Sequence, residues 1–472
     1  MAGTEHVISM EELLPRKVSL VREEAGETSR RRQSIEIEVE ASSTSKMRKE
    51  NLEKLKEAGA NVKRSSVAKT PPKIQEVPAL LRGQENFKKY FEPRVVSLGP
   101  IHHGKKECQA AEDFKLGMAS IFLEESGESG EFLLEKIAVK IKQLRHYFNE
   151  KVTEKYDDET LAWILFVDGC AVLQSIHCLA HEDLIKKLKI KNDKVAFVRQ
   201  DLLLLENQLP YQLLLDLMDY SAKKEELKTS IETFMKQMVH ERRQEDGKDG
   251  ETNGTPIHLL DLLRTKLVSK STTTESKSTS KQECRQSYRN VQELRAAGIY
   301  VKPAETSPLT KISFDRCLNF YPGYLRLPLI TVDDSTAPKF FNLIAYEMCS
   351  DFDNDYGITS YVAFLESLID NPGDVKELRN ASILYNLLGS DEEVSKLFNE
   401  IGTDLVPDFD EYKQVRTQIQ EYYDKKWVTC MAEFAHTHFS SPWTVLAFLG
   451  ALLALFLSAI QTWYTLFSPP GP

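Results

Sequence analysis

The stretch PWTVLAFLGALLALFLSAIQTWYTLF, residues 442–467, decides how this chain is organised, because it carries no charged side chain. If residues 443–463 form a helix, about 21 residues at a rise of roughly 1.5 Å give about 31 Å, which matches the hydrocarbon core of a bilayer. Trp443 stands at one end, and Trp463 and Tyr464 stand at the other, where interfacial aromatic residues are expected. The alternative is a buried core helix, but long core helices usually carry a polar residue on some face. The sequence therefore predicts a transmembrane helix over 443–463.

The position of this span predicts the topology of the protein. Only a short tail, 468–472, follows it, and the first twenty residues contain no apolar core of signal-peptide length. We therefore expect a single-pass protein of the plasma membrane whose larger part is cytoplasmic. Lys425 and Lys426, before the span, agree with the positive-inside rule. The N-x-[ST] matches at Asn253 and Asn380 would then carry no sugar.

Small residues recur within the span at Gly450, Ala454 and Ser458, four positions apart. Small residues at this spacing let two helices approach closely in lipid, which predicts self-association. The alternative is that the stripe reflects only the Gly and Ala content that is common in transmembrane helices.

The composition of the whole chain bounds its partners. A formal charge of −10 argues against nucleic acid, because phosphate binding needs a basic face. The seven cysteines form no C-x-x-C pair, so they are expected to be buried thiols rather than a disulfide framework. We expect the bilayer and an unidentified protein as partners, and no cofactor.

Three segments precede the span. Residues 1–73 are rich in charge and poor in aromatics, which predicts a disordered arm with a short charged helix around 47–58. Residues 74–439 are predicted to form a large, mainly α-helical domain with a small β-hairpin. Within it, the Ser/Thr-rich stretch 269–282 is expected to be an exposed loop.

Several local patterns place helices and strands in the domain. Residues 157–179 are strongly apolar, but Asp168-Gly169 and the limited length argue against a second span. The apolar run 201–218 should break at Pro210. Residues 312–334 alternate and contain the turn-favouring pair Pro322-Gly323, which predicts the hairpin.

Two amphipathic helices are predicted near the span. Ser390 and Glu393 have the spacing of a capping box, ahead of apolar residues at helical spacing from Val394. The second helix is indicated by a long apolar stripe that leads towards the span and comprises Tyr412, Val415, Ile419, Tyr422, Trp427, Met431 and Phe434.

Candidate chemistry is sparse. His102 and His103 lie in a Gly/Pro-rich loop, but neighbouring side chains point apart and no zinc-binding spacing completes a site. Asp168, Glu206 and Asn207 lie among apolar residues, where polar groups usually satisfy backbone amides. The acidic residues Asp351, Asp353 and Asp355 lack the glycine and distal glutamate of an EF-hand loop. No complete catalytic constellation is present, so we predict a protein that is not an enzyme.

The order of several motifs resembles a plant family named as domain of unknown function 247, which includes the UPF0481-type proteins. The motifs are GPIHHG at 99–104, VDGC at 167–170, DLLLLENQLP at 201–210, HLLDLLR at 258–264, ELRAAGI at 293–299, LPLITVDDST at 327–336, FFNLIAYE at 340–347, TSYVAFLESLI at 359–369 and LGSDEEVSKLFN at 388–399. The chain departs from the family pattern at Ile101, Ala171 and Met348. The resemblance implies a membrane-associated plant protein, and some grass members are linked to self-incompatibility. It implies no catalytic residues.

Two function classes follow. The first is a membrane-tethered interaction protein in recognition or signalling. The alternative is a membrane-bound hydrolase or metal enzyme that uses His102 and His103.

Overall fold

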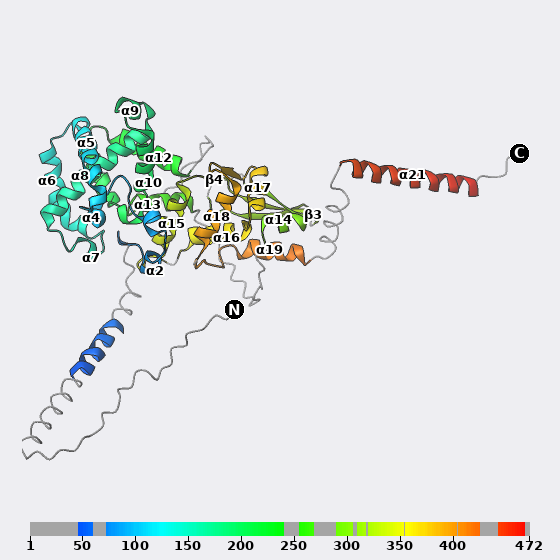
Figure 1. Cartoon of the computed structure of the whole chain (residues 1–472), viewed down its shortest axis with the longest axis horizontal. Helices are drawn as coiled ribbons and strands as arrows, with labels where there is room; N and C mark the ends of the chain where they lie inside the picture. The colour runs from blue at the N-terminus through cyan, green and yellow to red at the C-terminus, as the bar shows by residue number, and fades with distance from the viewer. Residues whose placement is uncertain are drawn as a thin grey trace, which may run out of the picture. The chain divides into compact units, whose positions relative to one another are not determined.

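The computed structural model of the chain describes residues 46–59, 72–239, 254–268, 289–304, 309–317, 320–353, 355–403, 405–424 and 442–467. The chain divides into two compact units, residues 1–70 and 71–472. In the first unit, residues 46–59 form a helix with exposed Leu52 and Leu55, which confirms the helix predicted there. Figure 1 shows the elements of the second unit by label.

The second unit is organised around one central helix, α8 (Asp158–Ala180). Asp157 caps its first turn, and α8 is long and apolar enough to cross a membrane, yet 94% of its most apolar window is buried within the unit. Asp168 and Gly169 do not interrupt the helix. A Cβ atom at Gly169 would lie 2.6 Å from Leu217 Cδ1, so glycine allows the helix α11 (Tyr211–Asp219) to pack closely on α8. The segment was predicted not to span a membrane because of an interruption and its limited length. Both grounds are wrong, and it is the burial of α8 that distinguishes it from a lipid-facing helix.

The other helices of the amino-terminal half surround α8 or join it to the rest of the unit (Figure 1). They are α2 (Ala79–Arg82), α3 (Phe87–Phe91), α4 (Gly99–His102), η1 (Lys106–Cys108), α5 (Gln109–Ser126), α6 (Gly130–Arg145), α7 (Glu150–Thr153), α9 (Glu182–Lys187), α10 (Asn192–Asp201), η2 (Leu205–Asn207), α11 (Tyr211–Asp219), α12 (Lys224–Val239) and α13 (Leu259–Leu267).

The predicted break at Pro210 is confirmed. Helix α11 begins directly after Pro210, which has no N–H to donate. The preceding apolar run, 202–209, is a buried loop around the short 3-10 turn η2. A buried loop leaves backbone groups without helical partners, so side chains must satisfy them.

The strands form two small sheets rather than one hairpin. β1 (Ile299–Pro303) pairs in parallel with β3 (Phe320–Leu327), and β3 pairs antiparallel with β2 (Ser313–Cys317). β4 (Ile330–Val332) pairs in parallel with β5 (Leu384–Asn386). An antiparallel pair is therefore present within 312–334, as β2 and β3, although its turn is not at the predicted Pro322-Gly323.

Pro322-Gly323 does not form the predicted turn. Both residues lie within β3, and a Cβ atom at Gly323 would lie 2.9 Å from the Phe314 ring. The glycine is needed for this close cross-strand contact, while the β2–β3 connection at 318–319 lies outside the described residues.

The carboxyl-terminal helices of the domain are α14 (Val291–Ala296), α15 (Thr336–Glu347), α16 (Gly357–Leu368), α17 (Pro372–Asn380), α18 (Asp391–Gly402) and α19 (Lys413–Tyr423). The Ser390 hydroxyl accepts a hydrogen bond from the Glu393 amide at 3.2 Å, as a capping box requires. The Glu393 carboxylate instead accepts from the Gly389 amide, at 3.1 Å. Ser390 therefore caps α18 as predicted, but the second half of the predicted capping box is not formed.

Some predictions fall outside the described residues. In the apolar stripe that leads towards the span, Tyr412, Val415 and Tyr422 are buried. Trp427, Met431 and Phe434 lie outside the described part of the chain, as do Lys425 and Lys426, Asn253 and the stretch 269–282.

The last helix is α21 (Pro442–Phe467), which includes all of the span predicted at 443–463. Its 18-residue apolar window, Leu446–Trp463, has a mean hydropathy of 1.9, and none of this window is buried. The core of the second unit elsewhere is one continuous cluster of buried side chains. Helix α21 is therefore long and apolar enough to span a membrane, and, unlike α8, it is not buried.

Candidate functional site

Glu206, in the 3-10 turn η2, binds residues at the amino-terminal edge of the domain, the segment 73–91. Its carboxylate is 3% exposed and accepts a hydrogen bond from the Val77 amide at 2.8 Å and another from Arg82. His102 Nε2 lies 3.2 Å from the other carboxylate oxygen. Burial raises the pKa of Glu206, but the contacts with His102, Val77 and Arg82 outweigh burial and lower the pKa overall. The structure thus brings together two of the predicted residues, His102 and Glu206, in a buried charge cluster.

Asn207 and Asp201 satisfy the backbone of the segment before α4. The Asn207 side chain accepts from the Leu98 amide at 2.6 Å and donates to the Val96 carbonyl at 2.9 Å. Asp201 accepts from the amides of Arg94, Val95 and Val96. Buried irregular backbone needs such partners, because it lacks the regular hydrogen bonds of a helix or a sheet. These side chains therefore position the loop.

Asp168, on α8, anchors the start of α4. It accepts from the Gly99 amide at 2.8 Å and forms an ion pair with Lys115 of α5, also at 2.8 Å, and both side chains are 2% exposed. Burial disfavours the charged form of Lys115, but the Asp168 carboxylate outweighs it and raises the pKa of Lys115. Burial raises the pKa of Asp168 overall, although Lys115 and the Gly99 amide oppose that effect, so the charged carboxylate depends on these two contacts inside the core.

Gly99 is the glycine that this arrangement requires. Its φ is +64°, and a Cβ atom would lie 2.9 Å from the Gln208 carbonyl oxygen. Gly99→Ala should therefore destabilise the domain by about 1–3 kcal/mol, through left-handed backbone strain and this contact. Gly104→Ala is a matched control, because Gly104 has φ +78° but no atom within 4 Å of a Cβ position. Equal losses of stability in urea unfolding of the two variants would contradict the close contact.

His102 and His103 do not form a joint site. His102 is fully buried against Glu206, whereas His103 packs edge-on against Tyr156 with ring centroids 6.0 Å apart. Within the described ranges, no group of three or more His, Cys, Asp or Glu side chains could hold a metal ion. The predicted motif residues Asp168, Glu206, Asn207 and His102 meet around the segment 96–102, where their contacts position backbone.

The later motifs make a second buried network. Arg264, from α13, binds the Glu347 carboxylate at 2.8 Å, and that carboxylate also accepts from the Ile358 and Thr359 amides. Two of the acidic residues that were considered as calcium ligands have other partners. Asp355 forms an ion pair with Arg264, and Asp351 accepts a hydrogen bond from the Lys73 amide. These contacts join α13, α15 and the start of α16.

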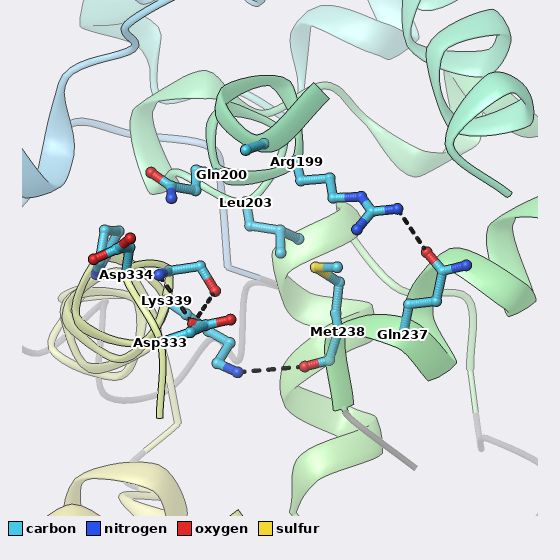
Figure 2. A pocket seen from close by; sticks show the side chains of 11 residues that line it. Arg199, Gln200, Leu203, Gln237, Met238, Asp333, Asp334 and Lys339 are labelled. Atoms are coloured by element: carbon cyan, nitrogen blue, oxygen red, sulfur yellow. Dashed lines mark hydrogen bonds between the residues drawn. The ribbon is translucent and has the colours of Figure 1, made fainter. Parts of the chain in front are cut away.

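A pocket that the sequence did not indicate lies between three elements. It is lined by Arg199 and Leu203 from α10 and the turn after it, Met238 from the last turn of α12, and Asp333, Pro338 and Lys339 around the start of α15, and its volume is about 270 Å³ (Figure 2). We call it the α10–α12–α15 pocket. One available signal was Lys339, a lysine in α15 that directly precedes the mainly apolar motif at 340–347.

The predicted anchor residues lie on α21. Gly450, Ala454 and Ser458 share one side of the helix at a spacing of four, and a Cβ atom at Gly450 would meet nothing within 4 Å. The Trp463 side chain is 64% exposed. Trp443 and Tyr464 lie within α21, near its two ends.

Comparison with known proteins gives matches over most of the chain. A family model, DUF247, described as plant protein of unknown function, matches residues 74–457. UPF0481 protein At3g47200 of Arabidopsis thaliana is 28% identical over 408 residues, covering 79% of this chain and 82% of that protein. Putative UPF0481 protein At3g02645 of the same plant is 21% identical over 474 residues, covering 80% and 87%. No solved structure matches the chain significantly.

Proposed function

This chain belongs to the plant family DUF247, whose function is unknown, and from this premise we propose that it is a membrane-anchored binding protein that acts in recognition or signalling. In this proposal α21 spans the plasma membrane, the domain at 72–424 lies in the cytoplasm, and its surface binds a protein partner. The protein does not catalyse a reaction.

The observation that carries the proposal is the exposure of α21. Leu453, Leu455 and Phe456 are each more than half exposed, which is costly in water but favourable in lipid. The polar Thr462 hydroxyl donates to the Ser458 carbonyl at 2.8 Å, so it needs no partner from outside the helix. Both features suit a helix that is surrounded by hydrocarbon.

The burial of His102 argues against catalysis by this residue. A general base or metal ligand must reach a substrate or ion, and His102 is fully buried beside Glu206. We therefore favour the interaction protein over the hydrolase or metal enzyme.

We predict that full-length protein stays in the membrane pellet after alkaline washing. A variant that lacks residues 442–472 should become soluble, and Leu453→Arg should weaken membrane retention, because arginine costs about 2.5–3.5 kcal/mol at the centre of a span. Val139→Arg is the matched control, since Val139 is 79% exposed on α6 of the domain. Retention of the truncated chain in the pellet would refute the anchor.

The same vesicles test the orientation. Protease added outside intact, right-side-out plasma membrane vesicles should leave the domain intact, and detergent should make it sensitive. Sugar on Asn380, which is exposed, or on Asn253 would place the domain on the opposite side.

We further propose that α21 associates with a second copy through Gly450, Ala454 and Ser458. Gly450→Ile should reduce cysteine cross-linking between copies in membranes, whereas Leu449→Ile should not. Unchanged cross-linking in Gly450→Ile would exclude this face.

A further inference from the structure

The helix at residues 46–59, in the first unit, exposes three large apolar side chains. Met47, Leu52 and Leu55 are 61%, 59% and 70% exposed, and every residue of the 46–59 helix is exposed. Isolated helices shorter than about 12–15 residues are only marginally stable in water. The 46–59 helix has 14 residues, so a surface that buries its apolar side chains would stabilise it.

The three apolar side chains lie on one side of the 46–59 helix. At about 100° per residue, Leu55 and Leu52 follow Met47 around the helix axis at about 80° and 140°. Asn51 and Ala58 fall within the same arc. An apolar face of this width suits a helix that lies along a surface.

The acidic side chains lie on the opposite side. All three glutamates of the 46–59 helix fall between about 240° and 300° from Met47, and they are Glu50, Glu53 and Glu57. The middle of the apolar arc lies at about 70°, so the glutamates point away from any surface that covers this arc.

Basic side chains border the apolar arc instead. Lys54 and Lys56 lie at about 340° and 180°, on its two sides, and Lys49 follows Lys56 at about 200°. Arg48 lies within the arc, where its long aliphatic stem can extend along apolar surface while the guanidinium stays in a polar layer. The remaining basic residue, Lys46, lies on the acidic side. A bilayer with anionic lipid matches this arrangement, because negative charge surrounds an apolar interior.

We propose that the 46–59 helix lies on the surface of a bilayer that contains anionic lipid, with Leu52 and Leu55 against the acyl chains and Lys54 and Lys56 at the lipid phosphates. This inference rests on the proposed function, which places this part of the chain on the cytoplasmic side, where anionic lipids are concentrated. The 46–59 helix is then a second contact with the membrane, and the anchor α21 raises its local concentration there.

The test is amide hydrogen exchange, followed by mass spectrometry, of the full-length protein in lipid nanodiscs of phosphatidylcholine with or without phosphatidylserine. We expect peptides from 46–59 to exchange at least about tenfold more slowly in discs that contain phosphatidylserine, because bound lipid opposes opening of the helix. Peptides from α8 should exchange equally in both kinds of disc if the domain is intact. Fast exchange of α21 peptides would contradict the anchor, whereas slow exchange of α21 with fast exchange of 46–59 would contradict only the surface helix.

Two double variants separate the faces of the 46–59 helix. Leu52→Gln with Leu55→Gln should abolish the slow exchange, because glutamine has nearly the helix propensity of leucine but removes the apolar face. Glu53→Gln with Glu57→Gln is the matched control on the opposite face, and it should keep the slow exchange. A helix stabilised only by Lys–Glu pairs along its surface would lose protection in the glutamate variant instead.

Three results would overturn the proposal. The first is equal exchange of 46–59 in the two kinds of disc, and the second is slow exchange that survives Leu52→Gln with Leu55→Gln. The third is equally slow exchange in detergent micelles without phospholipid, which would assign the apolar face to a contact with protein.

Discussion

Lys115→Met is expected to destabilise the domain by about 3–5 kcal/mol, because it leaves the buried Asp168 carboxylate without its counter-ion. Methionine can fill the space of the lysine stem, so little packing is lost. The remaining partner of Asp168 would be the Gly99 amide. Urea unfolding of the full-length protein in detergent, followed by circular dichroism, measures the loss.

Two further variants separate charge from packing. Adding Asp168→Asn to Lys115→Met removes the orphaned charge and should recover a large part of the stability. Lys413→Met, which breaks the exposed pair with Asp410, should leave stability nearly unchanged. If Lys115→Met matched Lys413→Met in effect, the buried pair would have no structural importance.

The second large effect is a pH dependence that comes from His258, the cap of α13. His258 is fully buried, and its Nδ1 accepts from the Asp261 amide at 3.1 Å, which requires the neutral ring. Burial lowers its pKa from 6.5 to about 4, and Asp261 only partly opposes this. The unfolded chain therefore binds a proton more readily than the folded chain does. The stability of the folded domain is unaffected by protonation of His258 above about pH 6.5, and it decreases as the pH falls from about 6.5 to about 4. The loss is about 3 kcal/mol.

His258→Asn is the variant that tests this. Asparagine also caps helices well but does not titrate. The difference in unfolding free energy between the native protein and the variant should therefore shift in favour of the variant by about 3 kcal/mol between pH 7 and pH 4. A difference that is constant over this range would show that His258 is not held neutral.

Local signals in the sequence predicted much of the fold. The cap at Ser390, the break at Pro210 and the uncharged helix at 443–463 depend on neighbours in sequence, so they could be placed. Asp168-Gly169 was misread as an interruption, because the residues that accommodate it, Lys115 and Leu217, come from other helices.

The candidate sites were less predictable for the same reason. His102 and Glu206 were singled out, but their contact joins residues over a hundred positions apart and no periodic pattern encodes it. The α10–α12–α15 pocket draws on three elements, and Arg199 looks like an ordinary surface residue until α12 and α15 are in place. Charged residues in apolar motifs were the useful signal, yet their partners required the tertiary structure.

The hydrogen bonds of the amino-terminal edge set the order in which the domain can be completed during synthesis. The Lys73 amide and the Gln75 side chain bind Asp351, and Asn86 and Tyr90 bind Glu400. Asn86 and Glu400 are 314 positions apart, so at about 5–20 residues per second a ribosome needs about 15–60 s to supply the partner. Tyr90 and Phe91, which end up buried, also lack the ring of Phe341 that packs against them until α15 has been made. That interval is when a chaperone would be most needed.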